Sequence, residues 1–213
     1  MRLGIIIPYY KNSGACEDNF KLLMEVLDKQ LTDNIILYIY EDGQYSSWLE
    51  KYSRNNICIT YDEENRGVSH ARNCGLDFIL DYPDIDYILF LDSDDMIDSN
   101  YLKKMYKALD GKTDILESRF FIKNKLYKYD SKYIREGVCG SCIKASLIGD
   151  LRFNEGLCIG EDSLFMRELL EKRDFTKKLV ETNYYYNLGD NINSLWMRYQ
   201  RHEINKKYIW EDK

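Results

Sequence analysis

The run Ile88-Leu89-Phe90-Leu91-Asp92-Ser93-Asp94-Asp95 is the most informative stretch of the sequence. Its four apolar residues predict the end of a buried strand, and three carboxylates follow within four residues. Carboxylates this close repel one another unless a cation lies among them. Because ligands bind beyond the carboxyl ends of the strands in an open parallel sheet, the run indicates a ligand-binding edge. The alternative is a solvated acidic turn before a helix that begins near Ser99.

Short β-rich runs alternate with longer helical patterns before this stretch. The predicted strands are 3–7, 35–40, 57–61 and 87–91, and the predicted helices are 19–31, 68–80 and a short one of capping-box form at Ser47-Trp48-Leu49-Glu50. This alternation is typical of βα units, so we predict an α/β fold with a mainly parallel central sheet flanked by helices. Later segments predict a helix over 99–109, a strand over 115–122, a hairpin through 124–128, a helix over 162–172 and a helical tail from Asn193.

Composition limits the classes of protein that fit. The 213 residues carry 30 Lys and Arg against 36 Asp and Glu, a net charge of −6 that disfavours nucleic acid as a partner. We expect one domain over residues 1–213, because no linker marks a boundary. The apolar runs are far shorter than the roughly 20 residues of a membrane span, and the first residues lack a secretory pattern, so we expect a cytoplasmic protein. We also expect the six scattered cysteines to be reduced thiols.

The four strands predicted in the first half end in residues suited to a ligand. These ends are Pro8-Tyr9-Tyr10, Glu41-Asp42-Gly43, the segment 62–67 and Asp92-Ser93-Asp94-Asp95. Aromatic rings, an arginine and several carboxylates are therefore expected along one edge of the sheet. Oxygen ligands with open coordination positions suit Mg²⁺ or Mn²⁺, which usually also bind waters and substrate phosphates.

Five segments follow one another along the chain: Gly4-Ile5-Ile6-Ile7-Pro8-Tyr9-Tyr10, Glu41-Asp42-Gly43, Asn65-Arg66-Gly67-Val68-Ser69-His70-Ala71-Arg72-Asn73-Cys74-Gly75, Asp92-Ser93-Asp94-Asp95 and Gly160-Glu161-Asp162. In this order they resemble the motifs of the family 2 glycosyltransferases, which have the GT-A fold, and the fourth segment resembles the DxD motif of that family. The resemblance covers residues 3 to about 195. It implies a single GT-A (Rossmann-like) domain with a small helical region on the acceptor side. Residues 1–110 would then form a nucleotide-sugar-binding half, 111–190 an acceptor-side half and 191–213 a helical tail.

The resemblance also implies roles for individual residues around the nucleotide. Asp42 would accept a hydrogen bond from the base, and Tyr9 would offer it a stacking face. The full set expected at the nucleotide is Pro8, Tyr9, Asp42, Arg66, Arg72 and Asp92. Two alternatives stay open, because Tyr9 could be a core aromatic and Arg72 could form a structural ion pair.

The same resemblance assigns the metal and the catalytic base. Asp94 would bind Mn²⁺ or Mg²⁺ directly, and Asp92 would approach the ribose or the water shell of the metal. Asp162, with Glu161 beside it, would take the proton of the acceptor hydroxyl, or it could simply be the N-cap of the following helix. The implied enzyme is inverting and moves one sugar from a nucleoside diphosphate sugar, with uridine diphosphate favoured. Its acceptor would be a glycan, a lipid-linked or another hydroxyl compound.

Some features depart from the family pattern. Members often carry a Trp before the Glu-Asp motif, and the matching segment 137–144 has none. Cys139-Gly140-Ser141-Cys142 has CxxC form, but no second pair follows at zinc-finger spacing. The tail around Trp196 and Arg198 could touch a membrane or a partner, or pack against the body of the protein. His202 in that tail could reach the metal or lie on the surface.

Two other classes of protein compete with this interpretation. An apolar run followed by Asp92 and Asp94 also resembles haloacid-dehalogenase-like phosphohydrolases, in which Asp92 would be the nucleophile. However, that motif normally opens its domain, and here three predicted strands precede it. The second rival is a sugar-nucleotide binding module without catalytic activity.

Overall fold

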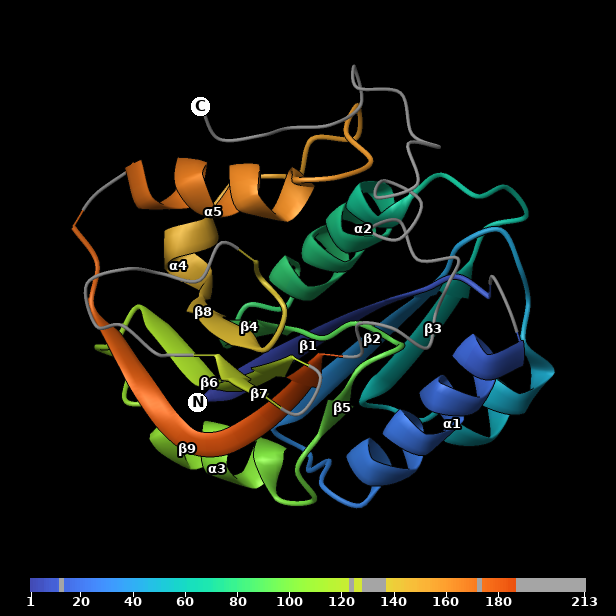
Figure 1. Ribbon diagram of the computed structural model, residues 1–213, viewed down its shortest axis with the longest axis horizontal. Coiled ribbons are helices and arrows are strands. Elements are labelled where there is room, and N and C mark those ends of the chain that lie inside the picture. Colours follow the sequence, from blue (N-terminus) through green and yellow to red (C-terminus); the bar gives the residue numbers. More distant parts are fainter. Residues whose placement is uncertain (12–13, 123–124, 128–136, 172–173, 187–213) are drawn as a thin grey trace.

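The computed structural model describes residues 1–11, 14–122, 125–127, 137–171 and 174–186. All strands among these residues join one sheet in the order β3-β2-β1-β4-β8-β6-β9-β5, with β7 paired to β6. Helices cover both sides of the sheet, with α2, α4 and α5 on one side and α1 and α3 on the other (Figure 1). The predicted α/β fold with a helix-flanked sheet is confirmed.

Four parallel strands form the first half of the sheet. β1 (Arg2–Tyr9) lies between β2 (Ile35–Glu41) and β4 (Ile85–Phe90), and β3 (Ile57–Tyr61) pairs with the far side of β2. Every residue of β2 is buried, which is typical of a parallel strand covered by helices on both faces. All four strands predicted here are confirmed, and their carboxyl ends form one edge, which we call the carboxyl edge.

The second half of the sheet mixes parallel and antiparallel pairs. β8 (Ser141–Lys144) is antiparallel to β4 and to β6 (Ile115–Ile122), and β6 is parallel to β9 (Lys177–Tyr186). The short strands β5 (Met96–Ile97) and β7 (Lys125–Tyr127) are antiparallel to β9 and β6. The sheet is therefore mixed but mostly parallel, and the predicted β6–β7 pairing is confirmed.

The helices differ in how well they were predicted. They are α1 (Gly14–Asp28), the 3-10 helix η1 (Ser47–Tyr52), α2 (Val68–Leu80), α3 (Tyr101–Ala108), α4 (Ala145–Ile148) and α5 (Glu161–Glu171). α2 has the predicted bounds, α1 begins earlier than predicted, and α4 was not predicted. The capping box at Ser47 is wrong: Ser46 precedes η1, and its carbonyl, rather than a hydroxyl, accepts from Leu49 N. The predicted tail 191–213 and His202 lie outside the described residues.

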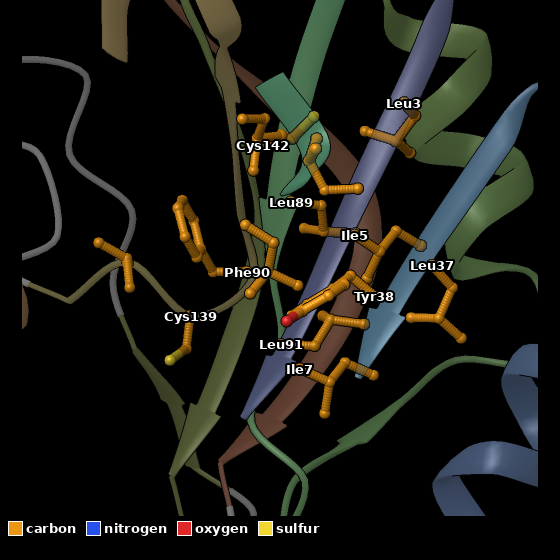
Figure 2. Packing of buried hydrophobic residues seen from close by; sticks show 14 of the residues in the cluster. Leu3, Ile5, Ile7, Leu37, Tyr38, Leu89, Phe90, Leu91, Cys139 and Cys142 are labelled. Carbon is orange, nitrogen blue, oxygen red and sulfur yellow. The ribbon is translucent and has the colours of Figure 1, made fainter. Parts of the chain in front are cut away.

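A close approach between helix and sheet sets the position of α2. A Cβ built on Gly75 of α2 would lie 2.5 Å from Ile6 Cγ2, and one on Gly4 of β1 would lie 2.4 Å from Ile79 Cγ2. Side chains from β1, β2 and β4 fill the core beside this contact, and Figure 2 shows them together with Cys139 and Cys142. No helix in the described part of the chain is both long enough and apolar enough to cross a membrane.

Candidate active site

The loop Asp92–Asp95, which we call the acidic loop, follows β4 at the carboxyl edge. Its carboxylates have different surroundings. Asp95 is buried and accepts a hydrogen bond of 2.5 Å from the hydroxyl of Tyr184, and that hydroxyl accepts one of 3.2 Å from Asp92 N. Asp94 is half-buried. Tyr184 therefore anchors the loop from β9, a role that the sequence did not reveal.

Arg72 joins the acidic loop to the Glu-Asp motif. Its side chain is 4% exposed, and it donates to Glu161 Oε1 at 2.8 Å and to Asp92 Oδ1 at 3.0 Å. The thiol of Cys139 donates to the other oxygen of Asp92 at 2.8 Å. Because an unpaired buried guanidinium would be strongly destabilising, these two carboxylates compensate the charge of Arg72. Arg72 thus forms the ion pair considered as an alternative to a place beside the nucleotide base.

Glu161 and Asp162 occupy the first turn of α5, where negative charge is favoured by the helix dipole. Burial raises the pKa of both carboxyls; the Asp162 charge raises the pKa of Glu161 further, and the nearby Arg72 opposes both shifts. Asp162 Oδ1 accepts from Ser163 N at 2.9 Å. Asp162 Oδ2 faces Gly137, where a Cβ would lie 3.0 Å from it. Asp162 is therefore within the helix and is not its N-cap.

The residues expected around the base lie at the end of β1 and β2. Asp42 is buried and accepts from Arg66 N at 2.6 Å and from Gly67 N at 2.9 Å, so it ties the end of β2 to the start of α2. Gly43 beside it has a φ of +76° and packs against the backbone of Asn65. The Arg66 side chain is 51% exposed and lies 3.7 Å from Asp62. Asp42 and Arg66 are thus brought to one place, as the sequence indicated.

Tyr9 packs in the core. Its ring is fully buried, and its centroid lies 4.4 Å from that of Phe20 and 6.3 Å from that of Trp48. It therefore cannot offer a stacking face to a ligand in this conformation, and it is the core aromatic of the alternative interpretation. The next residue, Tyr10, is 46% exposed and provides an aromatic surface at the same edge. Pro8, also expected near the nucleotide, is partly buried near the end of β1.

The described residues contain no group of three or more His, Cys, Asp or Glu side chains arranged to hold a metal ion. Both oxygens of Asp92 already accept hydrogen bonds, and Asp94, two residues further along the acidic loop, is half-buried. Mg²⁺ typically uses one or two carboxylates and completes its shell with substrate phosphates. The described residues therefore form no cage for a cation by themselves, and a cation bound at the acidic loop would take most of its ligands from substrate phosphates and water.

The helix-flanked, mostly parallel sheet of this chain has the GT-A fold, which it shares with solved structures. S. aureus TarS 1-349 in complex with UDP-GlcNAc has a TM-score of 0.70 at 21% identity, covering 91% of this chain and 61% of that one. The mannosyltransferase PcManGT from Pyrobaculum calidifontis has a TM-score of 0.65 at 13% identity, covering 94% of this chain and 60% of that one.

Sequence comparisons define the family. The sequence model of glycosyl transferase family 2 matches residues 4–174. The minor teichoic acid biosynthesis protein GgaA of Bacillus subtilis is 28% identical over 241 residues, which covers 97% of this chain and 53% of GgaA. The glycosyltransferase GlyA of Streptococcus pneumoniae is 27% identical over 129 residues, which covers 58% of this chain and 17% of GlyA. This chain belongs to glycosyl transferase family 2. It spans about half the length of GgaA and a smaller part of GlyA.

Proposed function

We propose that the protein is an inverting glycosyltransferase that moves one sugar from a nucleoside diphosphate sugar, a uridine diphosphate sugar in the first instance, to an acceptor hydroxyl. The observation that carries the proposal is the meeting of the acidic loop and the Glu161–Asp162 pair at Arg72. Family membership and the UDP-GlcNAc complex of the TarS neighbour support the donor class. The acceptor would be a glycan, a lipid-linked or another hydroxyl compound.

In the proposed reaction, Asp162 acts as general base. The acceptor oxygen attacks the anomeric carbon, the bond from that carbon to the diphosphate oxygen breaks with its electrons, and the acceptor proton passes to Asp162. Single displacement inverts the anomeric centre. Glu161 is held by Arg72, so the neighbouring Asp162 is the better placed of the two to accept a proton.

Donor binding would use the carboxyl edge. Arg66 and Tyr10 offer a cation and an aromatic face there, while Asp42 fixes the loop that carries Arg66. Asp94, with Asp92 near it, would hold Mn²⁺ or Mg²⁺ together with the donor phosphates. A bound cation would supply charge that stabilises the leaving diphosphate.

The two rival functions make different demands on these residues. A phosphohydrolase would use Asp92 as its attacking nucleophile, whereas the glycosyltransferase leaves Asp92 paired with Arg72 and hydrogen-bonded to Cys139. A binding module would take up nucleotide and release no sugar. A turnover assay with nucleotide sugars therefore distinguishes the proposed glycosyltransferase from both rivals.

The test measures UDP or GDP release from UDP-GlcNAc, UDP-glucose, UDP-galactose and GDP-mannose with Mn²⁺, using water or added saccharides as acceptor. For the best donor we expect Asp162→Asn to lower kcat by about 10²- to 10⁴-fold, because it removes the base. The dissociation constant of the nucleotide, measured by calorimetry, should stay within about threefold. Glu168→Gln, on the exposed side of α5, serves as the control. A loss of nucleotide affinity as large as the loss of kcat would contradict the assignment of Asp162.

The metal has a separate test. Asp94→Asn should abolish the Mn²⁺-dependent part of the rise in Tm that UDP produces. Asp84→Asn, an exposed substitution just before β4 at the opposite edge, should leave it intact. No Mn²⁺-dependent rise in the wild type would count against the proposed metal ligand.

A further inference from the structure

Arg72 contacts three segments that are distant in the chain. It belongs to α2, it donates to Asp92 of the acidic loop after β4, and it donates to Glu161 at the start of α5. These segments carry the proposed donor-side and acceptor-side groups. Arg72 therefore links the donor-side and acceptor-side groups of the proposed site.

The burial of the Arg72 charge costs free energy that a role in folding alone does not explain. The side chain is 4% exposed, and its Nε is buried with no hydrogen-bond partner among the residues that the structure describes. It lies over the ring of Phe153, with 5.3 Å between the guanidinium carbon and the ring centroid. Replacing a buried ion pair by apolar side chains of similar volume is often neutral or stabilising, so burial of this charge is poorly explained by folding energy. Its geometry offers a different explanation.

Asn73, the next residue of α2, contacts the segment that leads into α5. The Asn73 side chain accepts from Phe153 N at 2.8 Å and donates to Phe153 O at 2.9 Å. The segment from Phe153 leads into Gly160 and α5. α2 itself is fixed on β1 by the close contact at Gly75. Two consecutive residues of α2 thus contact the start of α5 and the segment that precedes it.

We propose that Arg72 is a positioning residue that sets Glu161, and through the first turn of α5 Asp162, at a defined distance from the acidic loop. This inference rests on the proposed function. It separates Arg72 from nucleotide recognition and couples the placement of the base to the placement of the donor. A guanidinium suits this task because two of its nitrogens donate in fixed directions, whereas a lysine ammonium is a single point charge.

The test compares wild type with Arg72→Lys, Glu161→Gln and the double variant. Arg72→Lys keeps the charge and loses the two-sided bridge, and we expect kcat to fall by about 10- to 100-fold, as for a small misplacement of reacting groups. The dissociation constant of UDP with Mn²⁺ should change by less than about threefold. Glu161→Gln should lower kcat much less in the Arg72→Lys background than in the wild type, since both changes break one link.

A second readout does not depend on turnover. Hydrogen exchange, followed by mass spectrometry, should rise in both the acidic loop and residues 153–163 in Arg72→Lys. Arg152→Lys is the matched control, because Arg152 also ties a loop to α2, through Asp77 at 2.7 Å, but is partly exposed and distant from the acidic loop in its contacts. This control should leave exchange in the acidic loop and kcat unchanged. Glu161→Gln probes the same link from the other side if Arg72→Lys does not fold.

The outcomes separate the inference from the proposed function. Unchanged exchange in both segments of Arg72→Lys would overturn the positioning role, as would a rise in the UDP dissociation constant equal to the fall in kcat. If hydrogen exchange rises in both segments of Arg72→Lys but the wild type turns over none of the donors, the result would support the positioning role and count against the proposed function.

Discussion

The contact between Gly75 and Ile6 makes a quantitative prediction about stability. A Cβ at position 75 would lie 2.5 Å from Ile6 Cγ2 and 3.0 Å from Ile6 Cγ1, and Ile6 is fully buried. Overpacking of this kind costs about 1–3 kcal/mol. Helix propensity returns up to about 1 kcal/mol for Gly→Ala in a helix interior. We therefore expect Gly75→Ala to lower the free energy of unfolding by about 1–2 kcal/mol.

The assay is thermal and urea unfolding of the full chain. For a chain of this size the predicted loss corresponds to a fall in Tm of about 2–8 °C. Gly14→Ala is the control, because nothing lies within 4 Å of a Cβ at the start of α1, and it should cost nothing.

A double-mutant cycle with Ile6→Ala tests the cause. The single Ile6→Ala change should cost about 2–5 kcal/mol through the cavity it leaves. In that background Gly75→Ala should be neutral or stabilising, because the atoms it would strike are gone. An equal cost for Gly75→Ala in both backgrounds would refute the argument that α2 is held by this contact.

Three further predictions concern the site. Tyr184→Phe removes the 2.5 Å hydrogen bond to the buried Asp95 and should lower the free energy of unfolding in urea by about 1.5–3 kcal/mol. Tyr185→Phe, the control, removes a half-buried hydrogen bond to Asp98 and should lower it less. Equal losses of stability would argue against Tyr184 as the anchor of the acidic loop. Because burial raises the pKa of Asp162, we expect the acid limb of the kcat profile to lie above the ordinary carboxyl value of about 4. Because the pKa of Glu161 is raised in the folded state, folding takes up a proton at pH values between the ordinary pKa of a glutamate and the raised one. The free energy of unfolding of the wild type, relative to that of Glu161→Gln, should therefore fall as the pH rises through this range. A difference in stability that does not change with pH would contradict this prediction.

The parallel half of the fold follows from local sequence, since β1, β2 and β4 each contain an apolar run that is buried on both faces, and the edge strand β3 is rich in β-branched residues although it is only partly buried. The second half depends on pairings that no local pattern specifies. β9 was missed although Val180, Thr182 and the run Tyr184–Tyr186 favour a strand, and its parallel pairing with β6 joins residues about 60 apart in sequence. Strand propensity in this segment was a signal that could have been used.

The site was predictable at the level of segments and less so at the level of side chains. The acidic loop and the Glu161–Asp162 pair were identified, and Arg72 was singled out for a different partner. Which way a residue points depends on tertiary packing: Tyr9 turns into the core toward Phe20, and Arg72 turns toward two carboxylates from distant segments. Sequence spacing fixes neither direction.

The pairing of β5 with β9 has a thermodynamic consequence for the acidic loop. The loop leaves one strand of the sheet at Phe90 and enters another at Met96, so both of its ends are held within the same sheet. Fixing a residue's backbone costs about 1–2 kcal/mol of conformational entropy, and here most of that cost falls on folding rather than on ligand binding. A diphosphate and its cation would meet a preorganised surface, and their binding entropy should carry little contribution from ordering these residues.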